Sequence, residues 1–442
     1  MFSATPFKFT DEEQQLFDVL LKNPKSTIRV MDDEKTIFAL RNEDDSLDLA
    51  QDYLELPPLW DTHMHLLNYA NVKSMVSLHR TKSVEDCIEA GKERLKTFTG
   101  DFLLGRGWNQ NEFTDQRFPT KEDLNKVSKE IPIIFTRTCG HVAIANDATM
   151  KLLDGNQHPD IDWETGTIIE AGLNELYALI PSPDVPTIKV MLLDAIEDLR
   201  YHGISEVHTD DFTALSDRDY EKVIRAYTEL DNEGKLKVKV VQQCLLQTKE
   251  ELEGFLAKGY RMGQGTQNFK IGPLKLLLDG SLGARTAYMR EDYHDDPGNR
   301  GIRIYSDLDL QELVDLANGQ GMDVIMHAIG DAAIDQAMDA IELTQKKYPR
   351  TNARHGIVHC QITSEDQLNR IASLNIVVYA QPIFIRDDSE ILESRVGKEK
   401  ASTSYNWKGM QDRGIEVLAG SDAPVVEFHV KENMRWNKVL IQ

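Results

Sequence analysis

The residues best suited to chemistry are two histidines that lie one residue apart near the start of the chain. His63 and His65 end the segment Asp-Thr-His-Met-His, which follows a short apolar run from Tyr53 to Trp60. Alternate side chains of a β-strand point to the same face, so the two imidazoles would lie side by side. Imidazole nitrogens are common ligands of divalent metal ions. The pair therefore predicts part of a metal site, to be completed by ligands from elsewhere in the chain.

Further candidate ligands follow at the ends of other apolar runs. His327 ends the run VIMH, His359 ends GIVH and Asp422 ends VLAGSD. Lys275 differs from these because it lies within its run, LKLLLDG. A single histidine beside an apolar run is more often a core or capping residue, so the prediction depends on the whole set. Imidazole and carboxylate ligands suit Zn²⁺ or a neighbouring first-row metal, and the set contains no cysteine for a thiolate structural site.

Eight short apolar runs of similar character begin at Trp60 and alternate with helical patterns. They occupy residues 59–65, 204–210, 237–243, 274–280, 323–330, 356–361, 376–381 and 416–422. Such alternation predicts an α/β fold with a parallel sheet, and eight strand–helix units predict a (β/α)8 TIM barrel. Functional residues of these barrels lie at the C-terminal ends of the strands. The histidines and Asp422 occupy such ends, whereas Lys270 is expected to precede its strand.

The spacing of the runs predicts the domain organisation. The first and second runs are separated by about 140 residues, far more than an ordinary strand-to-helix connection. We expect a large insertion there, a subdomain at 80–195 that covers the mouth of a 59–424 barrel; a separate domain between two others is the alternative. Residues 1–58 predict an accessory segment that contains a helix over 11–22 and a hairpin over 27–40.

Composition limits the partners of the protein. The 442 residues carry a net charge of −23, and 41% of them are hydrophobic. An acidic surface repels phosphate groups, so we expect neither nucleic acid nor an anionic membrane as a partner. Four scattered cysteines fit a reducing compartment. No signal peptide or stretch long enough to span a bilayer is visible, so we expect a cytoplasmic protein.

Several motifs, taken in order, resemble the amidohydrolase superfamily. They are DTHMH, LKLLLDGSLGART, DDPGNRG, MHAIGDAAID, VHCQ and GSDAPV. The chain more narrowly resembles the branch that contains N-substituted formamide deformylases, often called YtcJ-like, because GRGWNQNEF, RFPTKEDLN and TRTCGHVAIAN also match. The resemblance covers roughly residues 59–424. These motifs identify the superfamily and the branch, and none of them specifies a substrate.

The resemblance implies a role for each candidate ligand. His63 and His65 would bind the more buried metal together with Asp422. Lys275 would carry a CO₂-derived carbamate that bridges two metals, and His327 and His359 would hold the second metal. An unmodified ammonium cannot ligate a cation, so Lys275 contributes only if it is modified or deprotonated. Otherwise it is a barrel lysine paired with a carboxylate such as Asp279.

The implied reaction is hydrolysis of a non-peptide C–N bond of the amide, formamide or imide type. Metal-activated hydroxide would attack a small-molecule substrate, and Asp422 would act as the general base. Candidate substrate-binding residues are Asp279, Arg285, His141 and Trp108, each of which could equally be structural. The alternatives are a deaminase or ester hydrolase that uses the same metal ligands, or a non-catalytic, truncated metal-binding relative with a regulatory role. A homodimer is the candidate assembly.

Two features depart from the family. The segment PPLWD stands where members usually have Pro-Gly-Phe-(Ile/Val)-Asp, and the opening strands match poorly. The chain also ends 20 residues after Asp422, where members continue. We therefore expect an incomplete accessory β-sandwich at 1–58 and an atypical, truncated C-terminus at 425–442.

Overall fold

The computed structural model describes residues 9–31, 34–98, 100–138, 141–153 and 158–436. The chain forms two compact units, each of which is described by itself. The first comprises Met1–Leu66, Leu192–Ala214 and Asp219–Gln442, and the second comprises Leu67–Met191 with Leu215–Arg218. Helices α2 (Leu66–Ser74) and α7 (Val185–Tyr201) carry the chain between the units. Across the described ranges, every helix is too short or too polar to cross a bilayer.

Eight parallel strands form the central sheet of the first unit. They are β5 (Leu59–Met64), β12 (Ile204–Thr209), β13 (Lys239–Leu245), β14 (Phe269–Leu277), β15 (Val324–Ala328), β16 (Gly356–His359), β17 (Val377–Ala380) and β18 (Val417–Ala419). Each strand pairs with the next in chain order, from β5 to β18. All eight predicted runs are therefore confirmed as strands of a nearly closed barrel.

One predicted strand start is wrong. We expected Lys270 to precede the fourth strand, but β14 begins at Phe269 and includes it. Phe269 and Ile271 are buried on either side of the half-buried Lys270, so the alternating pattern extends five residues before the predicted start at Leu274. A long charged side chain can lie within a strand when its end reaches water, which explains why its polarity misled the prediction.

The barrel closes where β5 meets the segment that follows β18. The Asp422 amide donates to the His63 carbonyl at 2.8 Å, and the His65 amide donates to the Ala423 carbonyl at 2.8 Å. The Ser421 amide donates to the Asp61 carboxylate at 3.0 Å. Gly420 permits this approach, because a Cβ atom there would lie 2.6 Å from the His63 nitrogen. Closure therefore requires glycine at this position.

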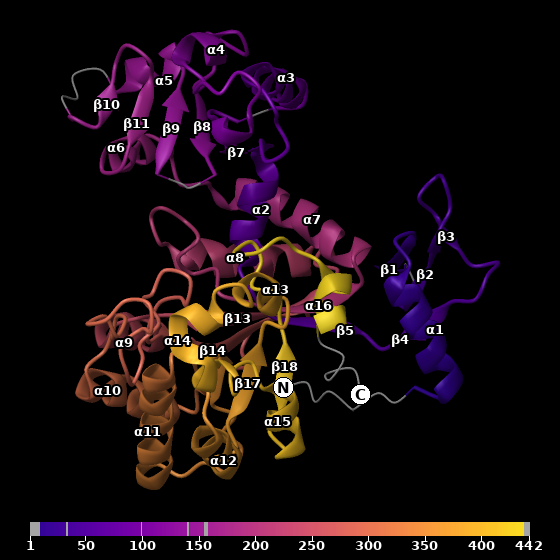
Figure 1. The fold of residues 1–442 in the computed structure, drawn as a ribbon, viewed down its shortest axis with the longest axis vertical. Coiled ribbons are helices and arrows are strands. Elements are labelled where there is room, and N and C mark those ends of the chain that lie inside the picture. The colour runs from indigo at the N-terminus through magenta and orange to yellow at the C-terminus, as the bar shows by residue number, and fades with distance from the viewer. Residues whose placement is uncertain (1–8, 32–33, 99, 139–140, 154–157, 437–442) are drawn as a thin grey trace. The chain divides into compact units, whose positions relative to one another are not determined.

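Helices follow most of the strands and lie outside them (Figure 1). They are α8 (Tyr220–Asn232), α9 (Lys249–Ala257), α10 (Asp307–Gly319), α11 (Asp331–Lys347), α12 (Glu365–Ser373), α13 (Phe384–Asp388), α14 (Leu392–Ala401) and α15 (Trp407–Asp412). In α11, Ile334, Met338 and Ile341 recur at helical spacing and are buried. Ser364 is the N-cap residue of α12, and Gly330 precedes α11 in the same position.

The N-terminal segment packs against the last described helix. Helix α1 (Asp11–Lys22) and the hairpin of β1 (Ser26–Val30) and β2 (Thr36–Arg41) confirm the prediction, and β3 (Leu47–Asp48) and β4 (Leu54–Leu56) complete one sheet. Phe17 and Phe38 share a core with Met434 of α16 (Val430–Trp436). Lys431 of α16 donates to the carbonyls of Asn23 and Ser26, each at 2.8 Å. The segment after Asp422 thus packs on the N-terminal segment.

The second unit has a sheet of its own. The strand order is β10 (Ile161–Asp162), β11 (Thr167–Ile169), β9 (Val142–Ala145), β8 (Ile133–Arg137), β7 (Leu103–Trp108) and β6 (Val76–Ser77). Its helices are α3 (Val84–Leu95), η1 (Gln110–Glu112), α4 (Lys121–Asn125), α5 (Asp147–Leu152) and α6 (Gly172–Ala178). Two apolar clusters pack around this sheet, one containing Phe135 and the other Ile134.

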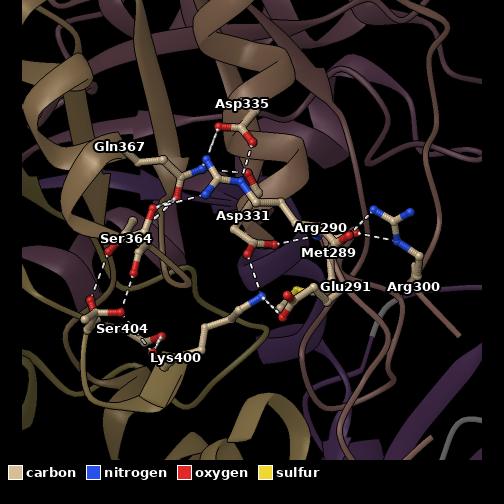
Figure 2. Close-up of polar contacts among 12 residues, drawn as sticks. Met289, Arg290, Glu291, Arg300, Asp331, Asp335, Ser364, Gln367, Lys400 and Ser404 are labelled. Carbon is tan, nitrogen blue, oxygen red and sulfur yellow. Dashed lines mark hydrogen bonds and ion pairs between the residues drawn. The ribbon is translucent and has the colours of Figure 1, made fainter. Parts of the chain in front are cut away.

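A network of ions anchors the long loop that follows β14. Arg290 of this loop donates to both carboxylate oxygens of Asp335 in α11, at 2.6 and 2.7 Å. Its backbone amide donates to Asp331 at 2.8 Å, and Lys400 of α14 donates to the other oxygen of that carboxylate at 2.7 Å. Figure 2 shows these contacts converging from three elements. The loop is therefore held on α11 at the end of the barrel where the strands terminate.

We predict that Gly420→Ala destabilises the first unit. The added methyl group would clash with the His63 backbone, which cannot move without opening the barrel, so the free energy of unfolding should fall by about 1–3 kcal/mol. Chemical denaturation would measure the loss. Gly254→Ala is the matched control, since nothing lies within 4 Å of that position in α9. Equal stability of Gly420→Ala and the wild type would contradict this role of the glycine.

Candidate metal centre

Three of the predicted ligands meet where the barrel closes. His63 lies in β5, His65 directly follows that strand, and Asp422 follows β18. Asp422 Oδ1 lies 3.0 Å from His65 Nε2 and 3.4 Å from His63 Nε2. One ligand atom of each residue lies within 4.8 Å of those of the other two. His63 and Asp422 are buried, whereas His65 is partly exposed to solvent.

Lys275 of β14 lies beside this group. Its side chain is buried, and its Nζ is 3.3 Å from His63 Nε2. Burial lowers the pKa of the Lys275 ammonium, although the carboxylates of Asp210 and Asp422 oppose the shift. A lowered pKa makes the neutral amine easier to reach, and the neutral amine is the form that can ligate a metal or react with CO₂. Asp279, the alternative partner of Lys275, instead accepts hydrogen bonds from the backbone amides of Tyr288 and Gly330.

The remaining two histidines complete the cluster. The ring centroids of His327 and His359 are 4.4 Å apart, and those of His359 and His63 are 5.8 Å apart. His327 Nε2 donates to the Gly280 carbonyl at 3.0 Å, which leaves its Nδ1 as the free ligand atom. His359 is buried, yet its Nδ1 has no hydrogen-bond partner. Because an unpaired buried nitrogen is costly, this atom points to a ligand, and the donor set fits a divalent cation.

The protonation of the imidazoles also fits a cation. Burial, followed by the Lys275 charge, lowers the pKa of His63 well below its usual value. Burial and the neighbouring His327 do the same for the pKa of His359. Burial also opposes protonation of His65, but Asp210 and Asp422 outweigh it and raise the pKa of His65 well above its usual value. Neutral imidazole is the ligating form, so metal binding at His65 would release a proton.

Two of the candidate ligands occupy strained backbone conformations. His359 has φ of 74° and Asp422 has φ of 58°, in the left-handed region that non-glycine residues seldom adopt. Such residues cost about 1–3 kcal/mol each and cluster at functional sites. The Asp422 amide bond to the His63 carbonyl holds one of them in place. These backbone conformations change the direction of the chain, and with it the direction of each side chain, near the end of its strand.

Two residues that the sequence analysis did not select orient the first histidine pair. His63 Nδ1 lies 2.7 Å from Gln243 Oε1, and His65 Nδ1 pairs with the Asp210 carboxylate. A partner on Nδ1 fixes the tautomer and leaves Nε2 of each ring for a metal. The available signal was position, because Asp210 and Gln243 are the last residues of the predicted runs 204–210 and 237–243.

Two of the candidate substrate-binding residues lie in the loop region after β14. The Asp279 carboxylate accepts hydrogen bonds from the amides of Tyr288 at 2.9 Å, Ile329 at 3.1 Å and Gly330 at 2.8 Å. One of its oxygens is also 3.3 Å from His327 Nε2. The carboxylate therefore fixes the loop and one histidine. The Arg285 guanidinium binds Asp295 of the same loop, at 3.0 and 2.9 Å.

The other two substrate-binding candidates belong to the second unit. Trp108 is fully buried in its core, and the indole Nε1 donates to the Phe135 carbonyl at 2.9 Å. His141 is exposed, and its Nδ1 lies 3.1 Å from a Glu170 carboxylate oxygen. The packing of Trp108 is that of a core residue. A role for either residue in substrate binding stays a prediction.

Comparison with known proteins agrees with this geometry. The sequence profile described as the amidohydrolase family matches residues 47–431. YtcJ of Bacillus subtilis (strain 168), whose name assigns it to the amidohydrolases, is 29% identical over 84% of this chain and 70% of its own length. N-substituted formamide deformylase of Arthrobacter pascens is 23% identical over 87% of this chain and 73% of its own. A solved metal-dependent hydrolase of Pyrococcus furiosus superimposes with a TM-score of 0.70 and 32% identity, over 84% of this chain and 73% of its own.

We predict that Asp61→Asn gains stability relative to the wild type as the pH rises. Burial is the main cause that raises the pKa of Asp61 from 3.8 to about 7, against the opposing hydrogen bonds from Ser421 and His63. The folded state thus binds this proton more tightly than the unfolded state, and the stability it contributes is lost between about pH 4 and pH 7. Because asparagine carries no charge, the difference between the two proteins should grow over that range, by up to about 4 kcal/mol.

Denaturation of the metal-free proteins at several pH values measures this difference. Asp61→Ala is the companion variant, because it removes the oxygen that accepts from the His63 and Ser421 amides. It should be less stable than Asp61→Asn at every pH, since two buried donors lose their acceptor. If the free energies of unfolding of wild type and Asp61→Asn differed by the same amount from pH 4 to pH 8, the raised pKa of Asp61 would be wrong.

Proposed function

Because this chain belongs to the amidohydrolase family, as the match over residues 47–431 shows, we propose that it hydrolyses a non-peptide C–N bond of a small molecule. The main support for this proposal is the group of His63, His65 and Asp422. Their candidate ligand atoms lie within 4.8 Å of one another at the carboxyl ends of barrel strands. The unpaired Nδ1 of buried His359 supports it.

We propose that the side chains that lie together there bind the metal. His63, His65 and Asp422 would hold one divalent cation, most simply Zn²⁺. His327 and His359 would hold a second, and Lys275, carboxylated on its amine, would lie between the two. Bound cations of this kind lower the pKa of water from 15.7 to about 7 and polarise a substrate carbonyl.

The protein's own groups then have distinct tasks. Asp422 takes a proton from the attacking water as the new C–O bond forms, and gives it to the nitrogen as the C–N bond breaks. Asp210 and Gln243 keep the Nε2 atoms of the histidine pair directed at the centre. The buried surroundings of Lys275 and His63 strengthen every charge interaction at the site.

The type of bond that the protein hydrolyses is a more specific proposal than its membership of the family. Similarity to a protein named N-substituted formamide deformylase favours formamides of organic amines as the first substrates to try. The barrel alone does not determine the bond, because one set of metal ligands serves several reactions. Ester hydrolysis, deamination and metal binding without turnover are therefore alternatives that the experiment must separate.

We predict that the purified chain contains one or two divalent metal ions and hydrolyses an N-formyl amine, a cyclic imide or an aryl amide. A chelator should abolish turnover, and Zn²⁺ should restore it. Asp422→Asn should lower kcat by roughly 10²–10⁴-fold, the contribution expected of a general base. Asp339→Asn, at the exposed surface of α11, should not change it.

The readouts separate the alternatives. Turnover on esters or aminopurines alone would assign a different bond, and bound metal without turnover on any acyl substrate would favour a binding protein. Turnover that survives complete removal of metal would eliminate the proposed mechanism. Metal content of Asp422→Asn, measured beside its kcat, distinguishes loss of the base from loss of the cation.

We predict a carbamate on Lys275. Protein equilibrated with ¹³C-bicarbonate and a divalent metal should show a carbamate carbon signal by NMR, because a neutral buried amine adds CO₂. The signal should be absent from Lys275→Met and present in Lys270→Met, which alters a lysine of the same strand. A signal that persists in Lys275→Met, or that the wild type lacks, would show that the lysine is not modified.

A further inference from the structure

The last described helix, α16, makes different contacts on two of its faces. Lys431 donates to two backbone carbonyls of the N-terminal segment, each at 2.8 Å, and the Arg435 guanidinium donates to a third at 2.9 Å. These two residues are four positions apart, so they lie on one face of the helix. Asn433 lies two positions from each, which places it on the opposite face. There it contacts the barrel instead of the N-terminal segment.

The Asn433 carboxamide joins two backbone segments at the carboxyl end of the barrel. Its Nδ2 donates to the Gly420 carbonyl at 3.0 Å, and its Oδ1 accepts from the Ile383 amide at 3.2 Å. Gly420 follows β18, and Ile383 precedes α13, which follows the neighbouring strand β17. Figure 1 shows α16 beside α13. Asparagine can make both bonds because its carboxamide carries a donor and an acceptor.

The first of these segments carries a candidate metal ligand. Asp422 lies two residues after Gly420, and its amide donates to the His63 carbonyl at 2.8 Å. Asp422 has φ of 58°, a conformation that persists only when the surrounding structure fixes it. The bond from Asn433 to the Gly420 carbonyl contributes to that fixation, because it holds the peptide that leads to Asp422.

The second segment carries an aromatic ring that contacts another candidate ligand. The Phe384 ring stacks on His359, with 5.9 Å between the ring centroids and 21° between the ring planes. Phe384 directly follows Ile383, whose side chain is fully buried and whose amide is bonded to Asn433. These two contacts of Ile383 hold the backbone that carries the ring. Asn433 is therefore connected through short stretches of backbone to groups on both sides of the ligand cluster.

We propose that Asn433 is a positioning residue of the metal centre. Its carboxamide holds the Gly420 peptide, and with it the Asp422 carboxylate, close enough to the histidine pair for one cation to bind all three. The same carboxamide keeps Phe384 against His359. This role rests on the proposed function only in that these ligands form a metal centre, and it requires no particular substrate. Helix α16 then connects the N-terminal segment to the ligand group.

Zinc titration of the full chain tests the proposal. Asn433→Asp keeps the size of the side chain and the acceptor for the Ile383 amide, but it replaces the donor to the Gly420 carbonyl by a second acceptor. It should weaken Zn²⁺ binding by about 10–100-fold, the effect of losing a group that orients a metal ligand. Competition with a chromophoric chelator measures this affinity. Lys431→Met is the matched control, because it removes contacts on the other face of α16 and should leave the affinity unchanged.

Cobalt provides a readout that a purely structural role of Asn433 would not change. The visible absorption of bound Co²⁺ depends on the ligands and the geometry around the ion. The spectrum of Co²⁺-loaded Asn433→Asp should therefore differ from that of the wild type, and the spectrum of Lys431→Met should match it. Unchanged affinity and spectrum in Asn433→Asp would overturn the proposal. Equal changes in both variants would assign the effect to loosened packing of α16 and would overturn it as well.

Hydrogen exchange in the wild type provides a second test if Asn433→Asp does not fold. Zn²⁺ should slow the exchange of backbone amides in residues 381–388 and 430–436 together, because a cation that fixes Asp422 also stabilises the segments bridged to it. Residues 249–257 of α9 should exchange at the same rate with and without Zn²⁺. Slower exchange in 416–422 without a change in 430–436 would contradict the bridging role of Asn433.

Turnover distinguishes failure of this proposal from failure of the proposed function. A wild type that binds Zn²⁺ but hydrolyses no acyl substrate would eliminate the proposed hydrolysis, and the affinity and the Co²⁺ spectrum would still decide the role of Asn433. A wild type that binds neither Zn²⁺ nor Co²⁺ would overturn both proposals. If the wild type is active, Asn433→Asp should lower kcat and change KM little, because it acts on the base rather than on contacts with the substrate.

Discussion

The backbone contacts between the first barrel strand and the segment after the last one govern the rest of the structure. Asp61 accepts the Ser421 amide, and the Asp422 amide binds the His63 carbonyl. The first of these bonds joins residues that are 360 positions apart in the chain. The carboxylate of Asp422 reaches the histidine pair because its own backbone is tied to theirs. The contacts that close the barrel therefore also bring the candidate ligands together, and Gly420 is the residue whose small size permits them.

The two ends of the barrel interior differ in how they treat charge. At the carboxyl end, positive and negative groups are interleaved, and Asp210 and Gln243 bond to the outer nitrogens of the histidine pair. At the amino end, the buried carboxylate of Glu206 lies 3.3 Å from His208 Nε2, and that of Asp323 lies 3.1 Å from the Arg350 guanidinium. Glu206 of β12 and Asp210, which directly follows the strand, lie an even number of residues apart and so share one face. This part of the chain thus contributes acidic groups to both ends of the barrel interior.

Periodicity and position made much of this architecture predictable from sequence. The eight strands were confirmed because short apolar runs between helical patterns have few other interpretations. The five candidate ligands predicted at the ends of these runs lie close together because parallel strands end at one rim. Asp210 and Gln243 also end predicted runs, but their position alone did not show that they bond to the histidine pair. The bonds of Asp279 were equally invisible, since its partners Tyr288, Ile329 and Gly330 are brought to it only by the fold.

Anomalous diffraction from crystals of the zinc-loaded protein, recorded on both sides of the metal absorption edge, would locate the cation. We expect a peak within about 2.0–2.2 Å of His63 Nε2, His65 Nε2 and an oxygen of Asp422, the distances at which zinc binds nitrogen and oxygen ligands. A fully loaded crystal whose peak lies away from these three atoms would contradict this expectation.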